Sequence, residues 1–166
     1  MFRIILFFLV LLACYPLQGQ TLEVEKFKFK GLSFRSTKEE IIKTLGQPRK
    51  IFEPNFECGF LSSEEQGKPF YALDYGNIRF VGNEEDGYIV DEYQFTYGMS
   101  FTYNGVRLDM DTGLDKLIEV FGMELFGSFH DSSTDSKLVR FNDSDDGFMF
   151  YLKEGRLSML SYWSPC

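Results

Sequence analysis

The sequence predicts an α+β fold made of two tandem repeats, each a strand, a short capped helix and an antiparallel β-meander. Three observations predict it. A helix-type segment occurs twice, 76 residues apart; β-rich runs follow each copy; and the helices precede most of the strands, which favours an antiparallel sheet. We place the repeats at 20–97 and 98–166 and expect them to share one antiparallel sheet with the helices on one face.

The repeated segment lies at 26–46 and again at 102–122. Aligned positions carry similar side chains, with Leu32 on Leu108, Ile41 on Leu117, Ile42 on Ile118 and Gly46 on Gly122. The apolar residues recur at helical spacing, and a glycine follows them where helices commonly end. Each copy therefore predicts one helix of about nine residues.

Each predicted helix begins with a capping-box pattern. Ser36 and Glu39 stand three residues apart in the first copy, and Thr112 and Asp115 do so in the second. In such a box the hydroxyl accepts from an N–H of the first turn, and the acid accepts from the capping residue's N–H. We therefore expect Ser36 and Thr112 to cap the two helices.

The rest of each copy is typical of strands. Runs of β-branched, aromatic and alternating residues are separated by Gly, Asn and Asp, and they occupy 71–75, 77–81 and 88–96, then 137–141, 148–152 and 156–163. Another strand is expected before each helix: one at 27–29, and a hairpin of 100–103 with 106–108 around Asn104-Gly105.

Residues 1–19 are typical of an export signal. Arg3 precedes ten apolar residues, too few to span a bilayer as a helix but suitable for a signal peptide. Two cleavage modes stay open. The Leu-Leu-Ala-Cys sequence ending at Cys14 matches a lipobox, which would make Cys14 a lipidated anchor; cleavage near Gly19 would instead leave Gln20 first. We expect the protein in the periplasm or cell envelope, with a membrane tether possible only through Cys14.

The cysteines agree with export. Cys14 is lipidated or removed in either mode, so Cys58 and Cys166 can pair in an oxidising compartment. Their disulfide would close a long loop, stabilising the fold by about 4–5 kcal/mol in the chain-entropy model. The rival interpretation is two separate buried thiols.

Several function classes are disfavoured. The formal net charge of −8 has the wrong sign for binding nucleic acid, and no glycine-rich phosphate loop follows a strand. The acidic run from Asn142 would need Glu at its twelfth position to hold calcium, but Lys153 stands there. We expect no metal, no cofactor and no catalytic residue. A carboxylate-based hydrolase ranks below the alternatives, because no spacing selects a facing pair of acids.

Aromatic residues provide the candidate binding site. Tyr93, Phe95 and Tyr97 share one face of a strand by period two, and Leu157, Met159 and Trp163 share one in the matching strand. Tyr and Trp are frequent anchors of protein interfaces. We therefore select Tyr93, Phe95, Tyr97 and Trp163 as binding candidates; the alternative is that they are all core.

The two helix segments resemble a family of small exported bacterial modules. Residues 104–122 read NGVRLDMDTGLDKLIEVFG and residues 31–48 read GLSFRSTKEEIIKTLGQP. Both are similar to the "G-x-x-x-G-M-T-x-x-E-V-x-x-x-L-G-x-P" helix found in the tandem β-lactamase-inhibitor-protein-like fold and in SmpA/OmlA envelope lipoproteins. Asp109 and Met123 depart from the pattern. The resemblance covers about 26–165 and implies a module that binds another protein on a sheet face and catalyses nothing.

The sequence thus predicts an exported, non-enzymatic protein-binding module, inhibitor-like or immunity-like, with an unidentified protein partner. The alternative is a lipid-anchored envelope scaffold tethered through Cys14.

Overall fold

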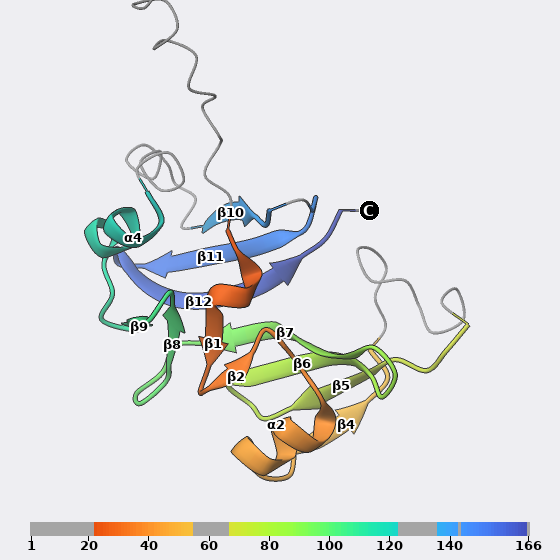
Figure 1. The fold of residues 1–166 in the computed structure, drawn as a ribbon. Helices are drawn as coiled ribbons and strands as arrows, with labels where there is room; N and C mark the ends of the chain where they lie inside the picture. The colour runs from red at the N-terminus through yellow and green to blue at the C-terminus, as the bar shows by residue number, and fades with distance from the viewer. Residues whose placement is uncertain (1–21, 55–66, 123–135, 143, 166) are drawn as a thin grey trace, which may run out of the picture.

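The computed structural model describes residues 22–54, 67–122, 136–142 and 144–165, which form two antiparallel sheets and two short α-helices (Figure 1). The small sheet has the strand order β2-β1-β8-β9. The large sheet has the order β10-β11-β12-β7-β6-β5-β4, and β3 also pairs with β7. The fold is thus α+β with predominantly antiparallel strands, as predicted.

The elements have the following bounds. The first half contains the 3₁₀ turn η1 (Val24–Lys26), β1 (Phe27–Phe29), β2 (Leu32–Ser33), β3 (Arg35–Ser36), α2 (Lys38–Leu45), β4 (Lys50–Phe52), β5 (Tyr71–Asp74), β6 (Ile78–Asn83) and β7 (Gly87–Gln94). The second half contains β8 (Ser100–Tyr103), β9 (Val106–Asp109), α4 (Leu114–Phe121), β10 (Ser136–Arg140), β11 (Gly147–Lys153) and β12 (Arg156–Trp163).

The predicted strands are confirmed with small shifts at their ends, but the single shared sheet is wrong. The strands before each helix form a sheet of their own, in which β1 pairs with β8. The meanders make the large sheet, where β12 pairs with β7. The separate sheet follows from packing, because the aromatic side chains of the small sheet lie against those of the large sheet and form the core between them.

The main core lies between the two sheets. Rings from the small sheet contact rings from the large one: Phe27 lies 5.1 Å from Phe148 and Phe29 lies 5.3 Å from Tyr93, measured between centroids. Both helices add to the same cluster, since Ile41 of α2 and Leu117 of α4 are fully buried in it. Burial of such side chains stabilises by roughly 1.5–3 kcal/mol each.

The first helix is capped one residue later than predicted. Thr37 is the N-cap: its Oγ1 accepts from the Glu40 N–H at 3.2 Å, and the Glu40 carboxylate accepts from the Thr37 N–H at 2.9 Å. Ser36 is buried instead and donates to the carbonyl of Ser33. The capping box exists, but the neighbouring hydroxyl provides it because Ser36 is held in β3.

The predicted cap of the second helix is wrong. Gly113 occupies the N-cap position and makes no side-chain bond, while the Thr112 hydroxyl accepts from the N–H of Asp109. Thr112 closes the turn that leaves β9, and its carbonyl accepts from the Leu157 N–H of β12. Both helices end at the predicted glycines, Gly46 and Gly122, each donating its N–H to the carbonyl four residues earlier.

Three predictions lie outside the described residues: the export signal at 1–19, lipidation at Cys14 and the Cys58–Cys166 disulfide. The described chain starts with Leu22, which is buried and bridges to the end of β10; its N–H donates to the Arg140 carbonyl at 3.0 Å. Within the described ranges, none of the helices combines the length and the apolar character that crossing a membrane requires.

Truncating Phe148 to alanine should lower the free energy of unfolding by about 3–5 kcal/mol, because its buried ring contacts both sheets and leaves a cavity behind. Urea denaturation followed by circular dichroism measures the change. Tyr97→Ala is the control, since Tyr97 is 98% exposed and should change stability by less than about 0.5 kcal/mol. Equal losses in the two variants would contradict the assigned core.

Candidate binding surface

The side of the large sheet that faces away from the small sheet carries a group of large apolar side chains. We call this group the outer face and define it by five residues on three adjacent strands: Leu138, Met149, Tyr151, Met159 and Trp163. Their neighbours along the strands, such as Val139, Phe148 and Leu160, are fully buried in the core. Because side chains alternate along a strand, the five project to the opposite side.

These five side chains are partly exposed, and none of them belongs to a buried hydrophobic cluster of the described residues. The register brings them together in rows. Leu138 lies opposite Met149, and Tyr151 lies opposite Met159. The outer face is therefore one contiguous surface rather than scattered apolar residues.

At one end of the outer face, the cationic side chain of Arg140 lies over the aromatic ring of Trp163. The Arg140 guanidinium lies 5.9 Å from the centre of the Trp163 ring. These residues stand on β10 and β12, which are not neighbours, and Gly147 of β11 lies between them in the register. Because Gly147 has no side chain, the two long side chains meet above it.

The other end leads into a shallow depression of about 490 Å³. Tyr151 and Met159 line one side, and Gln94 and Thr96 line the other. Tyr97 follows directly in the turn after β7 and is 98% exposed. An exposed tyrosine thus lies in sequence next to a hollow that could accept a partner side chain.

Two β-bulges decide which residues reach the outer face. In β12, Leu157 pairs with Leu152 and Met159 pairs with Tyr151, so Ser158 is the extra residue. In β7, Asp91 is the extra residue between Val90 and Glu92. Each bulge reverses the alternation beyond it. The expectation that Leu157 shares a face with Met159 is therefore wrong: Leu157 is core.

The bulge in β7 places two adjacent acids beside one arginine. Arg79 of β6 donates from Nε to Asp91 at 2.5 Å and from Nη2 to Glu92 at 3.0 Å. The Asp91 side chain is only 8% exposed. Burial raises the pKa of Asp91, and the hydrogen bond from Arg79 opposes that rise. This triad borders the outer face, because Glu92 pairs with Ser161 of β12.

Two of the four predicted binding residues do not lie on a surface. Tyr93 and Phe95 are 0% and 6% exposed and belong to the core between the sheets. The Tyr93 hydroxyl donates to the carbonyl of Ser100 in β8, and burial raises its pKa to about 12. They face inward because a small sheet covers that side. Tyr97 and Trp163 remain accessible at the margins of the outer face.

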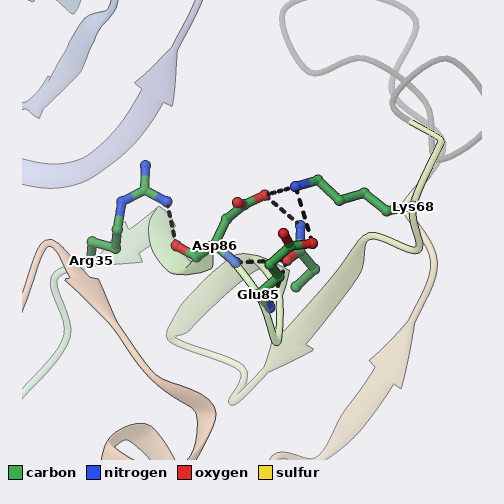
Figure 2. A network of polar contacts seen from close by, with 5 residues as sticks. Arg35, Lys68, Glu85 and Asp86 are labelled. Atoms are coloured by element: carbon green, nitrogen blue, oxygen red, sulfur yellow. Dashed lines mark hydrogen bonds and ion pairs between the residues drawn. The ribbon is translucent and has the colours of Figure 1, made fainter.

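A second depression, of about 500 Å³, lies at the β6–β7 turn and includes Arg35 and Tyr162. Figure 2 shows the polar network that fixes this turn: Lys68 pairs with Asp86 at 2.6 Å and with Glu85 at 3.6 Å, and Arg35 donates to the Asp86 carbonyl. The hydrogen bond from Lys68 lowers the pKa of Asp86. The Arg35 guanidinium thus holds a backbone carbonyl, so the arrangement is structural.

The described residues bring few carboxylates together in the depressions of the surface. The two depressions described above have one carboxylate, Asp86, among their lining residues. Among residues 22–54, 67–122, 136–142 and 144–165, no three His, Cys, Asp or Glu side chains are placed to hold a metal ion. Asp91 and Glu92 share one arginine and do not face each other across a cleft.

Comparison of the chain with protein-family models, with curated proteins and with solved structures found no match. The candidate site consequently depends on geometry alone.

Sequence reasoning missed most of the outer face. Leu138, Met149 and Tyr151 alternate with core residues in strands that were predicted correctly. The alternation of side chains in 137–141 and 148–152 could therefore have identified these three residues as one face. The residues on the two faces are similarly apolar, so the pattern does not show which face is covered.

Replacing Arg79 by glutamine should destabilise the fold by about 1–3 kcal/mol at pH 7, because the buried Asp91 carboxylate loses its charged partner. The loss should be smaller at pH 5 than at pH 8. Without Arg79 the folded-state pKa of Asp91 rises further above its unfolded value, so the folded state gains a proton first as the pH falls.

Chemical denaturation at the two pH values measures this difference. Arg107→Gln is the matched control, since Arg107 forms an exposed pair with Asp109 at 3.4 Å and should change stability by less than about 0.5 kcal/mol. A pH-independent loss in Arg79→Gln would contradict the role given to Asp91.

Proposed function

We propose that this protein is an exported, non-enzymatic module of the bacterial cell envelope that binds another protein, as an inhibitor or immunity factor does. The observation that carries the proposal is the outer face, where five large apolar side chains lie together on neighbouring strands outside both cores. Single exposed apolar residues are ordinary on a protein surface, whereas a contiguous group on one sheet face is typical of an interaction site.

The composition of the outer face supports a protein partner. Trp163, Tyr151, Met149 and Met159 are of the types enriched at protein interfaces, as is the neighbouring Arg140. The strands beneath them are paired on both sides or fixed by the core, so the surface is ordered before binding. Such a surface loses little conformational entropy when it binds.

The proposal includes duplication of one structural unit. Each half begins with a hairpin of similar turn geometry: φ is 52° and 88° at Lys30-Gly31, and 49° and 80° at Asn104-Gly105. The two hairpins pair through β1 and β8, and the last strands of the halves pair through β7 and β12. Ile41 and Leu117, aligned in the repeat, are both fully buried in one cluster. These equivalences support two repeats related by an approximate twofold axis.

A lipid-anchored envelope scaffold is the second candidate, and the position of Leu22 bears on it. Leu22 is fixed at the edge of β10, eight residues after Cys14. A lipid on Cys14 would hold the domain within about 26 Å of the membrane, at roughly 3.3 Å per residue. The tether would thus attach beside the outer face.

Binding through the outer face is tested by placing the photo-crosslinking residue p-benzoylphenylalanine at Met159 in the native host and irradiating living cells. We expect one discrete crosslinked protein from Met159, lost when Trp163→Ala is added. The control position is Ile51, which is 48% exposed on the distant edge strand β4 and should give no such product. The same product from both positions, or none from Met159, would refute the proposed interface.

The two candidate functions differ at the mature N-terminus. For a soluble binding module we expect the intact mass of a chain that begins at Gln20, and for the scaffold a chain that begins at a diacylated Cys14. Mass spectrometry of protein purified from the envelope distinguishes the two. Globomycin, which blocks lipoprotein signal cleavage, should shift the mass only in the second case.

A further inference from the structure

Building on the proposed function, we infer that the outer face takes a partner segment with a fixed order of charges. This segment crosses the strands with an acidic residue at the β10 end, apolar side chains over the middle and a basic residue at the β7 end. The inference rests on the arrangement of charges around the outer face, which differs between its two ends.

The β10 end carries one exposed arginine beside the aromatic ring of Trp163. The Arg140 side chain is 56% exposed, lies over the Trp163 ring and belongs to the strand at the edge of the sheet. Its only ion pair in the described residues is with Asp145, at 3.7 Å, and the Asp145 side chain is 82% exposed. Ion pairs that are so long and so exposed contribute little to stability. A carboxylate of the partner, bound to Arg140 over the Trp163 ring, would therefore compete well with Asp145 for the guanidinium.

The β7 end carries more acid than base. Arg79 forms ion pairs with both Asp91 and Glu92. One guanidinium therefore serves two carboxylates, which leaves an excess of negative charge within this triad. The Glu92 side chain is 25% exposed, so a basic group above the sheet can reach it. A lysine or arginine of the partner would complete this cluster.

The separation of the two ends limits the length of the segment. β10 and β7 are three strand steps apart, or about 14 Å at roughly 4.8 Å per step. An extended peptide that crosses the strands covers this distance in four or five residues, at roughly 3.3 Å each. The acidic and basic residues should therefore be separated by three or four others, at least one of them large and apolar.

The charges favour a different protein over a second copy or a membrane. Each chain carries a formal net charge of −8, so two copies repel each other, as do this chain and an anionic bilayer. A bilayer surface also lacks an ordered pair of opposite charges at this spacing. A segment of another protein supplies both charges and the apolar centre.

The test uses a displayed library of random twelve-residue peptides, selected on the folded protein. We expect the selected peptides to share the order acid, apolar, base, and to lose binding to Met159→Asp, whose added charge lies in the centre of the outer face. Thermal unfolding verifies that this variant is folded. Sedimentation equilibrium of the free protein shows whether a second copy occupies the outer face instead.

The order of charges is tested by exchanging the acidic and basic residues of the best peptide, which keeps its composition. The exchanged peptide should bind about three- to tenfold more weakly. The Arg140→Gln variant should bind the original peptide more weakly. Its affinity for a variant peptide with Asn in place of the acidic residue should be almost unchanged. Arg107→Gln should change the affinity for neither peptide.

Equal binding of the original and exchanged peptides would overturn the inferred charge order and leave the proposed function standing. Peptides that still bind Met159→Asp, with no crosslink from Met159 in cells, would overturn both. A dimer that Met159→Asp dissociates would make a second copy the occupant and overturn the inferred partner.

Discussion

The contact between the first hairpin and the large sheet is the constraint on which the rest of the structure depends. Phe27 lies within 5.5 Å of the ring centroids of Phe101, its neighbour in the small sheet, and of Phe148 in the large one. β1 comes from the first half of the chain, and β8 and β11 from the second. The aromatic core therefore joins the halves, and neither half alone could bury these rings.

The same contact determines which side of β10, β11 and β12 is buried in the main core. The small sheet and both helices contribute to the cluster that contains Phe148 and Leu160, so one side of β10–β12 is buried in the core. The opposite side keeps Met149, Met159 and Trp163 partly exposed. A sheet of alternating residues has to cover one face for stability, and over β10–β12 the second face stays outside the main core.

Local chemistry explains how much the sequence could predict. Alternation and turn residues located the long strands correctly, and the Asn104-Gly105 hairpin was found because both residues have positive φ values, which Asn and Gly tolerate best. The capping hydroxyl was displaced by one residue since Ser36 and Thr37 are adjacent and chemically equivalent in a pattern. Only the tertiary pairing of Ser36 in β3 distinguishes them.

The candidate site was harder to predict because it depends on two bulges and one covering sheet. Period two groups Leu157 with Met159, and the extra residue Ser158 separates them. Period two also groups Tyr93 with Tyr97 as a possible surface, yet β8 covers Tyr93 and leaves Tyr97 exposed. Neither bulge has a sequence pattern that would predict it here. The pairing of β1 with β8 is non-local, so neither segment alone carries a pattern that predicts the covering sheet.

The bulge in β7 affects both the stability of the core and the charge beside the outer face. A regular strand would direct Asp91 and Glu92 to opposite faces, and one of them would enter the aromatic core without a partner. The extra residue keeps both acids on the outer side, where a single arginine holds them. The arrangement satisfies the buried Asp91 carboxylate and leaves excess negative charge at the border of the apolar surface. The bulge that keeps a carboxylate out of the core therefore also places negative charge at one border of the outer face.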